Sequence, residues 1–290
     1  MLQAFSNEDQ EKVRIAVACS RPLLPQSFTV HYSLRFQQED RFGLHYENVC
    51  YPWPKPTHFC IFCHNPSREQ PQVYVYVPEN YDPSFLRTLT VQFFTRPPGV
   101  FLSEVDWRVL QAITALLNGK GHFTKPTVAD MYCMLAPQCK DLIEERILAP
   151  QGYYWDCLRE EDIETLAKTW RYSSQNEKNA FRLKIGCSPT VALRAEDTGE
   201  LASFEMVTFE GTMHHLFTVS QHRRRGLATL VEKRLAQQLI KLDILPCKYT
   251  DVEHEETGSF TKVNKLWSKI DDCSGCWTVF TVEQEERDSC

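Results

Sequence analysis

The 290-residue chain lacks the segments that would send a protein out of the cell or into a membrane. Residues 1–9 have neither the basic start nor the apolar run of a secretory signal, and their acids weigh against a mitochondrial transit peptide. Apolar runs such as residues 60–63 are far too short to span a bilayer. Residues 288–290 are not a prenylation box, which needs a cysteine four positions from the end. We therefore expect a cytoplasmic protein that binds no membrane, with a mitochondrial location as the open alternative.

An excess of positive charge is missing as well. The formal net charge is −6 at pH 7, which argues against a general affinity for nucleic acid. Low-complexity tracts and internal repeats at a fixed period are also absent. We therefore expect no nucleic-acid partner, and any phosphate that the protein binds must be held by a local site.

What remains is the composition of an ordinary globular protein. Hydrophobic residues make up 42% of the chain and charged residues 24%, which argues against a disordered chain. The length suggests two domains or one large one. Because no export signal is present, the 12 cysteines are better explained as reduced thiols than as a disulfide framework.

The first 150 residues predict strands followed by helices. Residues 59–62 and 73–77 are rich in β-branched and aromatic residues, which suit strands. From Ser103 the pattern turns helical, with Ser103 as the N-cap, and a second helix is expected to begin near Pro126. Residues 149–152, Ala-Pro-Gln-Gly, form the best break in the chain and predict a domain boundary at residue 150.

The second half has a more regular pattern. Residues 226–242 predict an amphipathic helix, since their leucines and one valine form a single apolar stripe. The other expected elements are helices at 160–170, 176–185 and 259–270, and strands at 190–194, 201–208, 213–219, 247–250 and 277–282.

Between an expected strand and the amphipathic helix lies the motif Arg223-x-x-Gly226-x-Ala228. Backbone N–H groups converge at a helix N-terminus and the helix dipole adds partial positive charge, so a phosphate binds well there. Gly226 and Ala228 are small enough for a diphosphate to approach the backbone. Arg223, Arg224 and Arg225 offer charge and bidentate donors. The alternative is a solvated basic helix cap or a run that resembles a nuclear-localisation signal.

Residues 217–227, Phe-Thr-Val-Ser-Gln-His-Arg-Arg-Arg-Gly-Leu, resemble the coenzyme A loop of the glycine N-acyltransferase family within the GNAT superfamily. Residues 158–177 and 187–193 resemble that family's helical segment and the strand after it. The resemblance implies an α+β fold with a GNAT-type mixed, mostly antiparallel sheet flanked by helices, in two GNAT-like halves. Residues 1–150 would form a degenerate N-terminal domain and residues 151–290 the domain that binds acyl-CoA.

The resemblance also implies a reaction, the transfer of an acyl group from coenzyme A to the amino group of glycine or another small amine. Acyl-CoA is then a co-substrate. The backbone of Phe217 and Val219 would bind the pantetheine arm. The diphosphate would be held by the loop and the first helical turn, that is by Arg223, Arg224, Arg225, Gly226, Leu227, Ala228 and Thr229.

This reaction needs a base for the amine and a proton donor for the departing thiolate. The family's glutamate falls at Thr212 in this chain, so the base has to come from elsewhere. Strand alternation would place Glu210, Thr212 and His214 on one face, which makes Glu210 and His214 the candidates, with water as the third. Tyr249 and Ser259 are the candidates for protonating the thiolate.

The displaced glutamate leaves a second class of protein open, a catalytically impaired paralogue that binds acyl-CoA in a binding or regulatory role. Glu210-Gly211 has the composition of a hairpin turn, where a side chain is expected to be solvated. The oligomeric state is not predicted.

Two Cys-x-x-Cys pairs make a zinc site a rival hypothesis. Residues 273–276 could form the tight turn that a tetrahedral site needs, but strand alternation sends the sulfurs of the pair at 60–63 to opposite faces. The adjacent His214 and His215 would likewise point apart on a strand. Because buried free cysteines are common core residues, we expect no metal.

Overall fold

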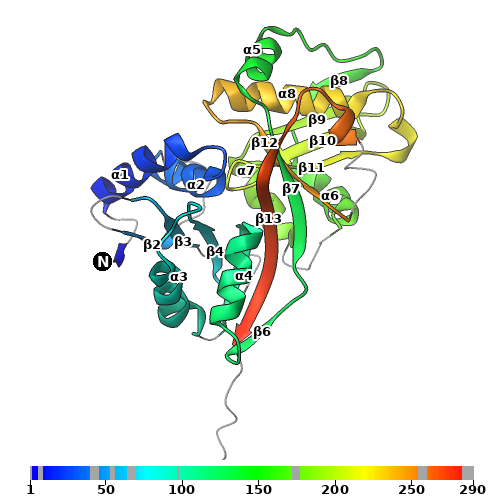
Figure 1. Cartoon of the computed structure of the whole chain (residues 1–290). Helices are drawn as coiled ribbons and strands as arrows, with labels where there is room; N and C mark the ends of the chain where they lie inside the picture. The colour runs from blue at the N-terminus through cyan, green and yellow to red at the C-terminus, as the bar shows by residue number, and fades with distance from the viewer. Residues whose placement is uncertain are drawn as a thin grey trace, which may run out of the picture.

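The computed structural model is a mixed, mostly antiparallel sheet with helices on both faces (Figure 1). It describes residues 2–5, 9–39, 46–52, 56–63, 69–96, 98–171, 177–253 and 260–282. The strand order is β1-β2-β3-β4-β5-β13-β7-β12-β11-β10-β9-β8, and β6 pairs with β13. Among the described strands only β4–β5 and β11–β12 are parallel pairs. The predicted α+β class is therefore confirmed.

The first half of the chain packs helices on both faces of its strands. Helices α1 and α2 cover one face of β3 and β4, and α3 and α4 cover the other. Its elements are β1 (Leu2–Phe5), α1 (Gln10–Ser20), η1 (Arg21–Leu23), α2 (Phe28–Gln38), β2 (Tyr46–Pro52), β3 (Phe59–Cys63), β4 (Gln72–Tyr76), α3 (Pro83–Leu89), η2 (Thr90–Phe94), β5 (Val100–Val105), α4 (Trp107–Leu116), β6 (Gly121–Phe123), β7 (Thr127–Cys133) and α5 (Ala136–Glu144).

The second half repeats the order of the first, because a strand, two helices, three strands, a helix and a strand follow one another in both. Helices α8 and α5 cover one face of its strands, and α6 and α7 cover the other. Its elements are β8 (Tyr153–Asp156), η3 (Glu160–Asp162), α6 (Ile163–Thr169), α7 (Glu177–Cys187), β9 (Thr190–Ala195), β10 (Leu201–Val207), β11 (Met213–Thr218), η4 (Ser220–His222), α8 (Leu227–Lys241), β12 (Cys247–Asp251) and β13 (Ser268–Val282).

The two halves exchange their last strands. β7 of the first half lies between β12 and β13, and β13 of the second half lies between β5 and β7. Figure 1 shows β13, in red, running beside β7. In the register, Cys133 of β7 lies opposite both Cys247 of β12 and Ser268 of β13. One sheet therefore contains strands from both sides of residue 150. The division of the chain into two domains at this residue stays a prediction.

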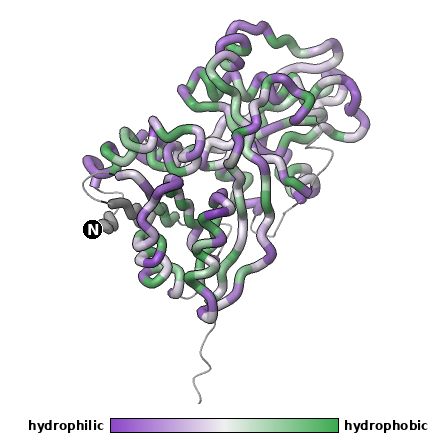
Figure 2. Tube along the Cα trace, in the orientation of Figure 1, coloured by the Kyte–Doolittle hydropathy of each residue, from purple (hydrophilic) through white to green (hydrophobic). Residues whose placement is uncertain are grey.

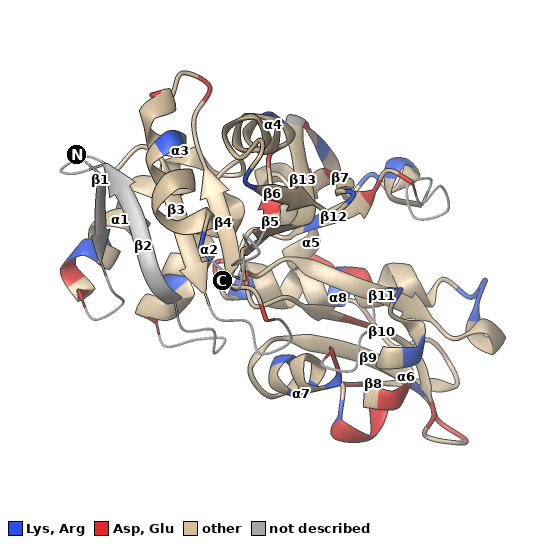
Figure 3. Ribbon diagram, turned by 90° about the horizontal axis from the view of Figure 1, so that it is seen from below, with Lys and Arg blue, Asp and Glu red and all other residues tan. Residues whose placement is uncertain are grey.

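Strand β3 shows how alternation distributes side chains between two cores. Cys60 and Phe62 pack with α3 and α4, while Phe59, Ile61 and Cys63 pack with α1 and α2. The two sulfurs thus lie on opposite faces, as alternation predicted. Because β3 is buried on both faces, apolar residues follow one another along it without a break. Figure 2 shows hydrophobic stretches in both halves, and Figure 3 shows charged residues of both signs over both.

Three of the expected helices were wrong in part. Ser103 lies in β5, and the N-cap of α4 is Asp106. The segment after Pro126 forms strand β7 before helix α5 begins. The helix expected over 259–270 gives way to β13 at Ser268. In each case the strand pairs with partners that are distant in sequence, and such pairing overrides local helical propensity.

Candidate functional site

Strands β11 and β12 are parallel neighbours that pair only where they begin. Among the described residues, the register joins Met213 to Lys248 and goes no further. Along its other edge, β11 pairs with β10 as far as Thr218. Beyond Met213, the edge of β11 that faces β12 therefore carries backbone groups that the sheet does not use.

Alternate residues of β11 present their backbone groups to opposite edges. The N–H of Val219 donates to the carbonyl of Ala202 in β10 at 2.9 Å, so it faces away from β12. Phe217 has the same orientation, and its carbonyl accepts from Ser203 Oγ at 3.1 Å. The backbone groups on the edge toward β12 are those of alternate residues such as Thr218. The backbone groups of Phe217 and Val219 thus face β10, and their expected role in binding pantetheine stays a prediction.

After Val219 the chain turns into α8 through a loop with two left-handed residues. Arg224 and Gly226 have φ angles of 60° and 74°. Gly226 is the N-cap of α8, and no side chain caps this helix. A Cβ added at Gly226 would meet no atom within 4 Å. The first N–H groups of α8, from residues 227–229, therefore open onto space in which an anion fits.

The three arginines of the loop differ in what they bind. Arg225 donates from Nη1 to the Tyr153 hydroxyl at 2.7 Å. Arg223 donates from Nε to the Thr218 carbonyl at 3.0 Å. Arg224 is exposed, and no hydrogen bond or ion pair joins it to another described residue. Arg223 and Arg225 therefore hold the loop in place, while Arg224 is the arginine left for an anionic ligand.

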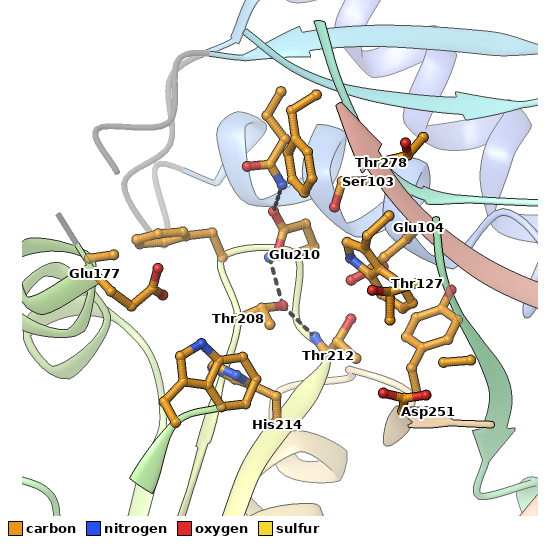
Figure 4. A pocket seen from close by; sticks show the side chains of 18 of the residues that line it. Ser103, Glu104, Thr127, Glu177, Thr208, Glu210, Thr212, His214, Asp251 and Thr278 are labelled. Atoms are coloured by element: carbon orange, nitrogen blue, oxygen red, sulfur yellow. Dashed lines mark hydrogen bonds between the residues drawn. The ribbon is translucent and has the colours of Figure 1, made fainter. Parts of the chain in front are cut away.

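A cavity of about 370 Å³ lies at the start of β11, between the two halves of the chain (Figure 4). Residues of β4 and β5 close it from the first half, and residues of β11, β12 and α7 close it from the second. Glu210, Thr212 and His214 all line it, but β11 begins only at Met213, and Phe209 and Met213 line it as well, so their common location is not the result of strand alternation. The cavity lies on the α7 face of the sheet, opposite α8.

Glu210 lies in the turn between β10 and β11 and, contrary to the sequence expectation, is buried with 5% of its surface exposed. The hydroxyl of Thr208 shapes this turn by accepting from the N–H of Thr212 at 3.1 Å. The side-chain amide of Gln72, in β4, donates to the Glu210 carboxyl at 3.3 Å. Burial raises the pKa of Glu210 to about 7, so near neutral pH the carboxyl readily accepts and releases a proton.

Glu104 of β5 is a second carboxyl in the cavity, and sequence analysis missed it. It has a left-handed φ of 55° and accepts a hydrogen bond from the hydroxyl of Thr29 in α2. Burial raises the pKa of Glu104 to about 7. No local signal marked this residue, because its segment has helical periodicity and every other carboxyl of the cavity is distant in sequence. Left-handed non-glycine residues are uncommon and cluster at functional sites.

His214 and His215 both face Trp170, so the prediction that they point apart was wrong. His215 has a left-handed φ of 59°, where the pairing of β10 with β11 shifts register. The ring centroids of His214 and His215 lie 5.4 and 4.9 Å from that of Trp170. Burial lowers the pKa of His214 well below its usual range and that of His215 to about 3. Both rings are therefore neutral at pH 7, and His214 is a weaker base than Glu210.

Tyr249 of β12 lines the cavity beside Trp277 of β13, with ring centroids 5.2 Å apart in an edge-to-face arrangement. Gly275 makes room for this pair, because a Cβ there would lie 2.7 Å from the Tyr249 ring. Burial raises the pKa of Tyr249 well above its usual range, so its hydroxyl keeps a proton at neutral pH. Ser259, the other candidate proton donor, lies outside the described residues.

The rival zinc hypothesis gains nothing from the geometry. Residues 273–276 lie in strand β13 instead of a tight turn. Over the described ranges, no group of three or more His, Cys, Asp or Glu residues is placed to hold a metal ion. In the same ranges, every helix is too short or too polar to cross a bilayer.

No protein-family model matches the chain, and no curated protein matches it. Solved structures do. A Drosophila protein from a structural genomics consortium has a TM-score of 0.77 at 11% identity, over 97% of this chain and 98% of that one. A tandem GNAT protein from the clavulanic acid biosynthesis pathway, without AcCoA, has a TM-score of 0.56 at 13% identity, over 98% and 100%. For a GCN5-related N-acetyltransferase from Sphaerobacter thermophilus the values are 0.53, 13%, 98% and 96%. The chain therefore has the α+β fold of the GNAT superfamily, in two GNAT-like units.

Proposed function

We propose that this protein is an acyl-CoA-dependent N-acyltransferase that acts on a small amine. One observation carries the proposal: β11 begins at the cavity, beside Thr212 and His214, and the chain after its other end leads through residues 219–225 to the uncapped N-terminus of α8 at Gly226. An extended acyl-pantetheine arm laid along the free edge of β11 would join these two places. The names of the similar folds, GNAT and GCN5-related N-acetyltransferase, support the same class of reaction.

In this proposal each end of acyl-CoA meets groups that suit it. The diphosphate binds the N–H groups of residues 227–229 and the guanidinium of Arg224, since a helix N-terminus and an arginine both favour phosphate. The amides of the pantetheine arm bind backbone groups of β11 such as those of Thr218. The acyl group then lies at the cavity, and the volume of about 370 Å³ suits a small acceptor.

The reaction balances with residues of the cavity wall. The Glu210 carboxylate takes one proton from the ammonium group of the acceptor, and the neutral amine attacks the thioester carbonyl. A C–N bond forms and the C–S bond breaks. The thiolate takes a proton from the Tyr249 hydroxyl, which the second amine proton restores through water. One ammonium ion and one thioester thus give one amide, one thiol and one proton.

The finer parts of the proposal rest on the sequence. Glycine as the acceptor is suggested by the resemblance of residues 217–227. The second candidate is a paralogue that binds acyl-CoA with little turnover, and the observation that favours it is Thr212 at the family's glutamate position. Glu210 weighs against this alternative, because its carboxyl enters the same cavity from the turn two residues earlier (Figure 4).

Isothermal titration of acetyl-CoA and benzoyl-CoA, followed by thiol release with a panel of amines, tests the proposal. We expect binding to the wild type and at least about tenfold weaker binding to the variant Arg224→Ala/Gly226→Glu, which places a carboxylate where the diphosphate binds. Lys241→Glu, at the opposite end of α8, changes the net charge by the same amount as the double variant and should bind as the wild type does.

Amine-dependent thiol release would then establish an N-acyltransferase. Binding without release for every amine would favour the paralogue. Unchanged binding to the double variant would show that the loop does not hold coenzyme A.

A further inference from the structure

The cations in the wall of the cavity are already paired, which bears on what the cavity can bind. Lys184 lies 3.8 Å from Glu177 in a pair that is largely buried. Lys125 lies 3.0 Å from Glu253 and is 83% exposed. His214 is neutral because burial lowers its pKa. Each lysine in the described part of the wall is therefore paired with an acid, and Lys125 is also exposed to solvent. Neither is available to bind the carboxylate of a substrate.

The anions of the wall, in contrast, are not all balanced. Asp251 pairs with Arg171 at 3.3 Å. Glu104 and Glu210 each accept a hydrogen bond from a neutral side chain of the first half, a hydroxyl and an amide. Across the described ranges, neither of these two carboxyls forms an ion pair. The cavity thus holds two carboxyls whose ionisation no cation among the described residues stabilises.

One buried polar atom of the wall has no partner. Nε2 of His214 has no hydrogen-bond partner among the described residues. The hydroxyl of Thr212, a residue with 3% of its surface exposed, lies close enough to Glu104 to lower the pKa of that carboxyl. Both residues line the cavity together with Glu210 and Glu104 (Figure 4). Buried polar atoms are rarely left unsatisfied in native proteins, so Nε2 of His214 indicates a polar ligand group in the cavity.

The rest of the wall is rich in aromatic rings. They come from β5, β12, β13, the end of α6 and the turn after β10, and are those of Phe101, Trp170, Phe209, Tyr249 and Trp277. Aromatic faces bind apolar bodies and attract cations. The wall therefore combines surfaces for a hydrophobic body with carboxyls for a positively charged group.

We propose that the acceptor is a primary amine with an aromatic or aliphatic body and no carboxylate, held at its ammonium group by Glu104 and Glu210. This inference rests on the proposed function and narrows it, because glycine and other amino acids carry a carboxylate. That carboxylate would lie beside two acids with no unpaired cation to receive it, and like-charge contacts in a desolvated site are costly.

The two carboxyls also suit the proton transfer. Burial raises the pKa of both to about 7, and an ammonium group beside them favours their ionised form. One carboxylate can then take the proton that the amine must lose, while the other keeps the site anionic. Amine binding is therefore expected to release protons at pH 6 and to be tighter at pH 8.

Matched pairs of acceptors test the selectivity of the wild type. With saturating acetyl-CoA, thiol release is measured for phenethylamine against phenylalanine and for tyramine against tyrosine, with glycine included. We expect kcat/KM to be at least about tenfold higher for each amine than for its amino acid. An equal or better rate with the amino acids or glycine would overturn the inference and leave the proposed function standing.

Glu104→Gln keeps the size of the side chain and removes its charge. We expect a raised KM for tyramine that falls less between pH 6 and 8 than that of the wild type, because only Glu210 still titrates there, with acetyl-CoA affinity unchanged. Glu145→Gln, an exposed residue that pairs with Lys233 outside the cavity, is the control and should match the wild type.

Thiol release from no acceptor, despite acetyl-CoA binding, would contradict the proposed function. Titration of tyramine and tyrosine into the protein with bound coenzyme A would then test the selectivity by itself. Tighter tyramine binding would support the inference, and equal binding would overturn it.

Discussion

Gly211 and Glu210 form the turn between β10 and β11, and both are fixed by residues of the first half. Gly211 has a left-handed φ of 89°, and a Cβ there would lie 3.1 Å from the ring of Phe36 in α2. The turn therefore packs closely against α2. Gln72 of the neighbouring strand β4 donates a hydrogen bond to the Glu210 carboxyl. Burial in this turn raises the pKa of a glutamate with an ordinary sequence context to about 7.

Substitution of Gly211 by alanine tests this arrangement. Gly211→Ala adds both a left-handed strain and a clash with Phe36, whereas Gly199→Ala in the β9–β10 turn adds only the strain, since its nearest atom would be 3.8 Å away. We expect Gly199→Ala to cost about 1 kcal/mol of unfolding free energy and Gly211→Ala about 2–3 kcal/mol. Urea denaturation measures both, and thiol release should fall only for Gly211→Ala. Equal losses would mean that the contact with α2 does not position the turn.

At the scale of elements, local pattern was sufficient where an element is defined by its own sequence. Helix α8 and strands β9, β10 and β11 were predicted within a few residues, because the apolar stripe and the glycine turns are local. Strand β5 was taken for helix, since nearly all its residues are buried and the helical periodicity of α4 follows it directly. Strand β13 was missed up to residue 277 because Ser274 and Gly275 are poor strand residues, which their pairing with β7 holds in the strand.

The exchange of β7 and β13 predicts that the halves do not separate when the chain is cut between them. A protease site inserted at the exposed turn of Gln151 and Gly152 would allow cleavage of the folded protein. On gel filtration we expect the cleaved protein to elute at the volume of the uncut protein, because each piece holds a strand inside the other's sheet. In 6 M urea the cleaved sample should elute later than the uncut chain in 6 M urea, as pieces of about half its length. Separation of the pieces without urea would show that the halves behave as independent domains.

At the scale of the whole molecule, sequence could predict half of the site. The loop of residues 223–229 is local, so its sequence was enough to select it, and its role in binding acyl-CoA stays a prediction. Glu210, His214 and Tyr249 were candidates from sequence, and all three line the cavity. The contributions of Gln72, Ser103 and Glu104 could not be predicted, since they reach the cavity only through the packing of one GNAT-like unit on the other. Long-range packing also produces the buried state of Glu210, which its turn sequence did not suggest.

Burial has placed two opposing sets of titratable groups in this molecule. The pKa values of His31 and His58 fall to about 4 and that of His215 to about 3, so each binds fewer protons folded than unfolded below pH 6.5. Their stabilising effect is present above pH 6.5 and is lost as the pH falls. Glu104 and Glu210 have pKa values of about 7 against an ordinary 4.5, so they bind more protons folded than unfolded. The stability that this extra proton binding gives to the folded state is lost as the pH rises through 7.

Between pH 6.5 and pH 8 the carboxyls and the histidines are therefore expected to change the stability in opposite directions. Two carboxyls with pKa values of about 7 should together lower the unfolding free energy by about 1–2 kcal/mol over this range, while the histidines raise it. Glu104→Gln/Glu210→Gln removes only the carboxyl contribution, so its unfolding free energy should rise by about 1–2 kcal/mol relative to that of the wild type between the two pH values. Glu145→Gln, on the exposed surface between α5 and α8, should keep the wild-type pH dependence. Urea denaturation at the two pH values measures all three proteins. A double variant whose pH dependence matches that of the wild type would show that water or a cation reaches these carboxyls, and the cavity would then lose its preference for an ammonium group as well.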